Sequence, residues 1–141
     1  MSAGFVGSGI EPEILAELLG ARRGMTGPAR PGTDVYMTED PPTLHVTMDL
    51  AGLDTDTLRI ALDGDMLTVT GQRRRPAESG RRVYHHAEID WGRFERNMRL
   101  ATPVDPNKSL VTYERGLLQI ALPLAARPVI TRVMLTVRVV G

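Results

Sequence analysis

Histidine is the side chain best suited to acid–base catalysis and metal binding near neutral pH, and this chain contains His45, His85 and His86. Adjacent residues of a strand point to opposite faces, so His85 and His86 cannot bind one metal ion from a regular strand. A Ser-His-Asp arrangement can be assembled on paper from Ser79 or Ser109, but no local motif supports it. We therefore expect exposed or hydrogen-bonded histidines, no metal site and no enzyme.

Phosphate binding is the other chemistry that the charged residues suggest. Five arginines between residues 73 and 82 could contact phosphates. The run has no interleaved aromatic residues, which favours a solvated loop over a nucleic-acid site. The one lysine, Lys108, lies in a turn, and no glycine-rich phosphate loop accompanies it. The sequence thus predicts no cofactor and no nucleic-acid partner.

Most of the chain alternates apolar and polar residues with a period of two, the pattern of a strand with one buried face. Asp63 and Gly64 end one such run and are a strong hairpin signal, because Gly accepts positive φ without steric cost. Gly116 similarly leads into the last clear run, which Pro123 ends. The alternating residues are Leu44, Val46, Met48, Leu50, Leu58, Ile60, Leu62, Leu67, Val69, Leu118, Ile120 and Leu122.

Further strands are predicted at residues 34–39, 83–87, 94–100 and 109–113. Pro41 and Pro42 separate the first of these from its neighbour, and both should lie where no ladder hydrogen bond is needed. Seven or eight short strands joined by Gly, Asp and Pro turns indicate an all-β protein with an immunoglobulin-like β-sandwich.

The chain divides into three predicted regions: an N-terminal segment with its linker, 1–33; the sandwich domain, 34–123; and a C-terminal extension, 124–141. The first region contains one short amphipathic helix by its apolar spacing, before a Gly- and Pro-rich linker at 24–33. The apolar residues at helical spacing are Ile10, Ile14, Leu15, Leu18 and Leu19.

Composition narrows the possible classes of protein. A chain of 141 residues is the size of one domain. Its 17 basic and 17 acidic residues balance, so no overall field attracts it to nucleic acid or to an anionic membrane. It has no cysteine, which excludes disulfides, and shows neither a signal pattern nor a membrane-spanning run. We expect a cytoplasmic protein without a membrane partner.

Two segments depart from the compact pattern. A long polar stretch, 71–82, precedes the strand-like residues 83–87, and loops of that length are usually functional or disordered. The C-terminal extension alternates again through Val133, Leu135 and Val137. Two interpretations of it remain open: it is the last member of the chain's own sheet, or it docks as an added strand in a groove on another subunit.

Several separated blocks, in order, resemble the α-crystallin domain of small heat-shock proteins of the bacterial and plant type. The resemblance covers about Asp34 to Pro123. The chain departs from the family at Ala51, where proline is common, at Val111, where a small residue is usual, and at Arg115, where asparagine is usual. Arg115 is poorly suited to positive φ. The matching blocks are DLAGLD at 49–54, LRIALDGDMLTVTGQR at 58–73, WGRFERNMRL at 91–100, VD at 104–105 and VTYERGLLQIALP at 111–123.

The resemblance implies an ATP-independent holdase chaperone, a homo-oligomer built from dimers by strand exchange, whose other partners are unfolding client proteins. In this family type, a strand in the long loop pairs with the edge of the partner's sheet. Residues 83–87 match that strand, and Arg96 matches an interfacial arginine expected to pair with a carboxylate across the dimer. The expected dimer-interface residues are Val35, Met37, Val83, Tyr84, His85 and Arg96.

The resemblance also implies a groove that receives the tail, between residues 58–62 and 109–113. Both Val133-Met-Leu135 and Leu135-Thr-Val137 are candidates for the family's Ile-x-Ile/Val pair, and the N-terminal apolar residues are expected to bind clients or neighbouring subunits. A non-catalytic CS-domain-like co-chaperone or binding module is the alternative, although such proteins lack the long arm and the strand-forming tail. The groove residues are Leu58, Ile60, Leu62, Leu110 and Thr112.

Overall fold

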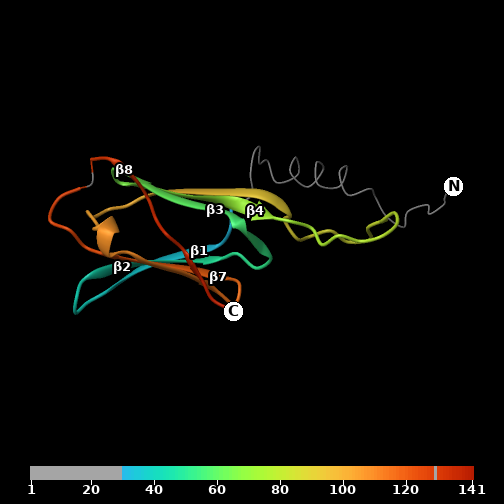
Figure 1. Ribbon diagram of the computed structural model, residues 1–141, viewed down its shortest axis with the longest axis horizontal. Coiled ribbons are helices and arrows are strands. Elements are labelled where there is room, and N and C mark those ends of the chain that lie inside the picture. Colours follow the sequence, from blue (N-terminus) through green and yellow to red (C-terminus); the bar gives the residue numbers. More distant parts are fainter. Residues whose placement is uncertain (1–29, 129) are drawn as a thin grey trace.

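The computed structural model describes residues 30–128 and 130–141 (Figure 1). The predicted amphipathic helix within residues 10–23, and most of the predicted linker, lie outside the described residues. Within the described part, every regular element is a strand except one 3-10 turn, Pro106–Lys108. The prediction of an all-β protein is therefore confirmed.

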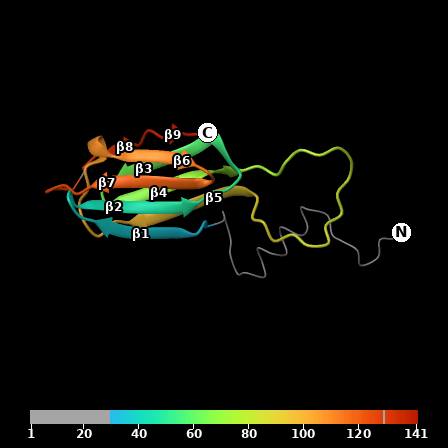
Figure 2. The same cartoon turned by 90° about the horizontal axis from the view of Figure 1, so that it is seen from below.

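The strands form two sheets that pack face to face (Figures 1 and 2). One sheet has the strand order β1-β2-β7-β6-β9 and the other has the order β5-β4-β3-β8. Neighbouring strands are antiparallel, except that β9 runs parallel to β6. The predicted β-sandwich is thus confirmed. The strands are β1 Thr33–Thr38, β2 Thr43–Asp49, β3 Leu53–Asp63, β4 Met66–Arg73, β5 Gly92–Arg99, β6 Leu110–Glu114, β7 Leu117–Pro123, β8 Arg132–Met134 and β9 Arg138–Val139.

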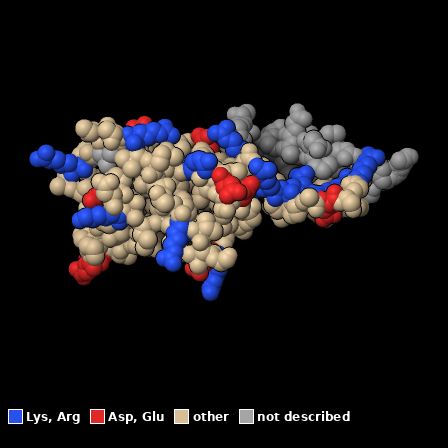
Figure 3. Space-filling model, in the orientation of Figure 1, with Lys and Arg blue, Asp and Glu red and all other residues tan. Residues whose placement is uncertain are grey.

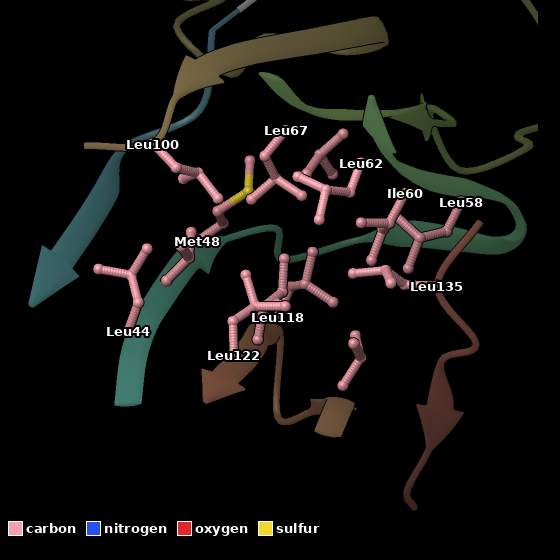
Figure 4. Packing of buried hydrophobic residues seen from close by; sticks show 14 of the residues in the cluster. Leu44, Met48, Leu58, Ile60, Leu62, Leu67, Leu100, Leu118, Leu122 and Leu135 are labelled. Atoms are coloured by element: carbon pink, nitrogen blue, oxygen red, sulfur yellow. The ribbon is translucent and has the colours of Figure 1, made fainter. Parts of the chain in front are cut away.

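The alternating residues identified in the sequence form the core between the sheets (Figure 4). Leu and Val side chains from β2, β3, β4 and β7 interdigitate there, and Phe94 of β5 is the largest fully buried side chain. Phe94 lies against Gly71 of β4, where an added Cβ would come within 2.7 Å of the ring. Gly71 therefore makes room for the ring of Phe94.

The hairpin predicted from Asp63 and Gly64 is present between β3 and β4, and the two residues of its turn are Gly64 and Asp65. Asp63 pairs with Met66, and Gly64 between them has a φ of 61°. The side chain of Arg99 at the end of β5 donates to both carboxylate oxygens of Asp65, at 2.8 Å each. The backbone N–H of Leu100 also donates to the carbonyl of Asp65, at 2.7 Å. The turn is therefore attached to the strand beside β4 as well as to its own hairpin.

The turn between β6 and β7 shows how the chain accommodates Arg115. Arg115 and Gly116 both have positive φ, 55° and 80°, as a type I′ two-residue hairpin turn requires. The carbonyl of Gly116 accepts from the N–H of Leu50 at 2.8 Å, and the hydroxyl of Tyr113 donates to the carbonyl of Leu50 at 2.8 Å. The surrounding contacts thus fix a backbone conformation that Arg disfavours.

We expect Arg115→Asn to stabilise the protein, because Asn tolerates positive φ better than Arg does. The gain should be about 1 kcal/mol, seen as a rise of several degrees in the unfolding midpoint by calorimetry. Arg115→Ala is the matched control, since it removes the same charge but remains unsuited to positive φ. Equal midpoints for the two variants would attribute the effect to charge and contradict the strain argument.

The sandwich is open along two sides, because strands at the edges of the two sheets do not pair with each other. β1 and β5 border one side, while β6 and β3 border the other, where β9 and β8 attach (Figure 2). Between β4 and β5 the chain leaves the sandwich as a long arm, residues 74–91, which extends beyond one end of the sheets (Figure 2).

Candidate functional site

The first candidate surface is the side of the sandwich between β3 and β6. Leu58, Ile60 and Leu62 of β3 point into the sandwich and are almost fully buried. On β6 the inward positions are Val111, which is 2% exposed and pairs with core residue Ile120, and Tyr113, which packs against the core. Apolar side chains therefore line this side on both strands.

Two groove residues expected from β6 lie on the opposite face of the sheet. Leu110 is 61% exposed and pairs with Ala121, while Thr112 pairs with Gln119 of β7 and with Arg138 of β9. Each residue expected to line the groove on this strand thus comes one position before a residue that faces inward. Sequence reasoning missed Val111 and Tyr113, although continuing the alternation of β7 through the Arg115-Gly116 turn would have found them.

The C-terminal extension of the same chain occupies this side. β8 pairs antiparallel with β3, so that Val133 lies opposite Leu62, and the N–H of Leu135 donates to the carbonyl of Ile60 at 2.9 Å. Leu135 is only 8% exposed and lies beside Leu58 and Ile60 (Figure 4). Val133 and Val137 pack partly against the core. The two candidate motif pairs share Leu135, which is the residue that the tail buries most completely.

The opposite side of the sandwich is less covered. Val35 and Met37 of β1 lie opposite core residues Val46 and Leu44, so they face inward, yet they are 51% and 47% exposed. Tyr36 faces outward and stacks on His45 with ring centroids 4.9 Å apart. Since β1 is the edge of its sheet, this side combines half-exposed aliphatic side chains with backbone groups free to pair with another strand.

Arg96 borders the same side from the other sheet. It lies on β5 opposite the buried Val69, and therefore on the inner face. Its Nε is buried and has no hydrogen-bond partner among the described residues. A buried donor without an acceptor is costly, so the position calls for an acceptor from elsewhere.

The arm carries the remaining expected interface residues. Val83 is half-exposed, and Tyr84 lies under the guanidinium of Arg75, 5.1 Å from its centroid, and near Arg82, whose Nη1 donates to the Tyr84 hydroxyl at 3.1 Å. The space-filling view shows basic side chains along the arm (Figure 3). At its base, Arg73 donates to the carbonyl of Ala51 at 2.8 Å and lies over the ring of Trp91. The arm is therefore anchored where it leaves the sheet.

The described residues were predicted to hold neither a metal ion nor a membrane-spanning segment, and two observations bear on these sites. No group of three or more His, Asp or Glu side chains there is arranged to hold a metal ion. No helix there is long and apolar enough to cross a membrane. What the described surface does offer is strand edges and aliphatic side chains, which are the means of binding extended polypeptide.

Comparison with known proteins agrees with this geometry. Residues 36–137 match the sequence model of the Hsp20/alpha crystallin family. The chain belongs to this family. The match begins within β1 at Tyr36, includes β2 to β8 and ends at Val137, just before β9, so the resemblance predicted from the sequence blocks is confirmed.

Two curated relatives illustrate the similarity. Small heat shock protein C4 of Rickettsia felis is 29% identical over 93 residues, which are 66% of this chain and 56% of that protein. The 18 kDa heat shock protein of Streptomyces albus G is 34% identical over 86 residues, covering 60% of this chain and 59% of that protein. The chain thus aligns with slightly more than half the length of such relatives.

Solved structures show the same fold. Heat shock protein 16.0 from Schizosaccharomyces pombe superposes with a TM-score of 0.60 at 23% identity, covering 69% of this chain and 88% of that one. The hspA protein from Xanthomonas axonopodis gives a TM-score of 0.58 at 21% identity, covering 72% and 99%. The α-crystallin sandwich is therefore shared at low sequence identity.

The Tyr113 hydroxyl joins β6, which borders the side between β3 and β6, to Leu50 in the loop after β2. Loss of this hydrogen bond should weaken that side of the sandwich. We expect Tyr113→Phe to lower the free energy of unfolding by about 1 kcal/mol, because the carbonyl of Leu50 loses a partly buried hydrogen bond. Urea titration measures the change. The matched control is Tyr36→Phe, at a tyrosine that is 48% exposed, and a comparable loss in that variant would contradict the assignment.

Proposed function

We propose that the protein is an ATP-independent holdase, which binds unfolding proteins through displaceable apolar surfaces and prevents their aggregation. One observation carries the proposal: an aliphatic wall with Leu58, Ile60 and Val111 lies on the open side of the sandwich where, among the described residues, a short terminal segment pairs with β3 and buries Leu135. Membership of the Hsp20/alpha crystallin family, and relatives named as heat shock proteins, support it.

An unfolding client offers what these surfaces bind, namely extended segments with aliphatic side chains and unpaired backbone groups. Burial of about 300 Å² of apolar surface would contribute roughly 7 kcal/mol before association costs are subtracted. Those costs are of similar size, so each contact is weak and reversible. Weak contacts suit a protein that holds clients until other machinery releases them, and they require neither catalysis nor a nucleotide.

The N-terminal apolar residues remain part of the proposal. Ile10, Ile14, Leu15, Leu18 and Leu19 lie outside the described residues, and we retain them as a segment that contacts clients or neighbouring subunits on the strength of their spacing alone. We likewise propose the division of the chain into an N-terminal segment, 1–33, a domain, 34–123, and a C-terminal extension, 124–141. We also propose that the protein is located in the cytoplasm.

A homodimer formed by strand exchange completes the proposed assembly unit. Residues 83–87, predicted as a strand, form no regular strand in the single chain. We propose that this arm segment of one copy, with Val83, Tyr84 and His85, becomes a strand when it pairs with the edge of β1 in the other. Its apolar side chains would then cover Val35 and Met37, which are half-exposed in the single chain. A carboxylate from the second copy would also give the Nε of Arg96 the acceptor that the described residues lack.

If dimers form through β1, a charge substituted on this strand should weaken the dimer more on the inner face than on the outer face. We expect Met37→Asp to raise the dimer dissociation constant about tenfold or more, because it places a charge on the inner, covered face. Tyr36→Asp is the matched control, with the same charge, the same strand and nearly equal exposure, but on the outer face. Sedimentation measures both constants, and equal effects would argue against arm docking at this side.

Holdase activity is tested directly by light scattering of a heat-labile client without ATP. We expect the full chain, at about one chain per client, to reduce scattering by more than half, and added ATP to change nothing, because binding relies on buried apolar area alone. An inert protein at equal mass concentration is the control. A client that aggregates equally with the chain and with the inert protein would rule the function out.

A further inference from the structure

Charge is unevenly distributed along a chain that is neutral overall. Residues 73–82, which lead from the end of β4 into the arm, contain five arginines and one glutamate. Residues 34–40, which run from β1 into the turn after it, contain three carboxylates and no basic residue. Figure 3 shows several of the basic side chains on the arm. One segment is therefore basic, while a segment at a sheet edge is acidic.

Two arginines of the arm gather around Tyr84. The guanidinium of Arg75 lies 5.1 Å from the ring centroid, and Nη1 of Arg82 donates to the hydroxyl at 3.1 Å. Arg82 also donates to the carbonyl of Pro76. Among the described residues, no carboxylate pairs with either guanidinium. Because a guanidinium has five N–H donors, Arg82 retains donors for an anionic group.

The carboxylates of the acidic segment are equally without partners. Glu39 and Asp40, at one end of β1 (the end carboxylates), are exposed, and so is Asp34 at the other end. None of these three carboxylates forms an ion pair or a hydrogen bond with a residue that the structure describes. Between them lie Val35 and Met37, the half-exposed apolar pair of β1. The apolar pair is therefore flanked by available negative charge on both sides.

The alternation of faces determines where Arg82 lies when the arm segment 83–87 covers the apolar pair. Opposite residues of paired strands share a face. In an antiparallel pairing, Val83 lies opposite Met37, and the residue two positions later lies opposite the other member of the pair. Arg82 then lies opposite Thr38, the last residue of β1, beside the end carboxylates.

A parallel pairing would cover the same apolar pair but make a different charged contact. Val83 would lie opposite Val35, and Arg82 would lie opposite Asp34. Antiparallel pairing is slightly more stable per residue than parallel pairing. It also brings Arg82 to two carboxylates instead of one. Both differences favour the antiparallel direction.

We infer that a charged contact between Arg82 of one copy and the end carboxylates of the other fixes the direction of the arm and selects the partner. The inference rests on the proposed strand-exchange dimer. Two-fold symmetry repeats the contact, so each dimer contains it twice. A chain with the wrong charge at either segment would be repelled, and the contact therefore contributes to specificity more than to affinity.

Charge reversal in separate chains tests this contact. At low salt, we expect Arg82→Glu and Glu39→Arg each to raise the dimer dissociation constant about tenfold, because both contacts change from attraction to repulsion. The difference should nearly vanish at about 1 M salt, where the Debye length is about 3 Å. An equimolar mixture of the two variants should associate as tightly as the unmodified chain, since each arm in the heterodimer again meets the opposite charge. Sedimentation measures all three constants.

Rescue in the mixture separates a contact between chains from a local effect. Loss of the hydrogen bond from Arg82 to Tyr84 would weaken the arm in every combination, so a mixture that stays weak would overturn the inference. Asp34→Arg is the matched partner variant, because it reverses a charge at the other end of β1. Rescue of Arg82→Glu by Asp34→Arg instead of Glu39→Arg would overturn the antiparallel direction.

The remaining outcomes distinguish the contact from the dimer itself. An unmodified dimer whose dissociation constant does not change in Arg82→Glu would reject the contact and retain the dimer. An unmodified chain that sediments only as a monomer would reject the proposed dimer, and the inference with it. The thermal unfolding midpoint shows whether each variant is folded. If Arg82→Glu does not fold, Arg82→Gln, which removes the charge without reversing it, takes its place and should weaken the dimer by a smaller factor that salt abolishes.

Discussion

Two sheets packed face to face can bury their inner faces, but they cannot pair their edge strands with each other. In this protein that constraint leaves β1 and β5 on one side, and β3 and β6 on the other, as places where aliphatic side chains and backbone groups reach the surface. A closed barrel would have no such edges. The tail on one side, and the half-exposed aliphatic residues with the unpaired Arg96 Nε on the other, are consequences of the same open architecture.

The sequence predicted the strands well where one face is buried, because burial imposes a period of two that is visible residue by residue. Leu58, Ile60 and Leu62 are inward as their alternation indicated. The prediction for β6 was less exact, since the segment reads Leu-Val-Thr-Tyr and apolar character alone does not decide between Leu110 and Val111. The phase is set by pairing with β7 across the turn, and pairing is a property of the hairpin rather than of the strand.

Which groove the tail occupies was beyond the sequence for a different reason. Val133, Leu135 and Val137 alternate identically whether they cover their own sandwich or another one, so both interpretations fitted the pattern. In the single chain the backbone of Leu124 and Ala125 is bonded to the sandwich, and the tail that follows pairs with β3 of the same chain. Hydrogen bonds between backbone groups distant in the sequence leave no signature in composition or periodicity, and they appear only with the fold.

The two-strand tail also resolves a conflict between solubility and binding. The proposed holdase function needs an apolar surface, yet an apolar groove with free strand edges would promote aggregation if it stayed open. A covering segment from another subunit protects the groove only while the assembly persists, whereas a tethered segment protects it at any dilution. Leu135 stabilises the attachment of the tail through its burial. The hydrogen-bonded ladders of β8 and β9 are short, so they add little and allow the tail to detach. Under the proposed holdase function, a client segment that enters this groove would have to replace the same contacts, so the affinity of the tail for the groove would set the threshold for binding clients there.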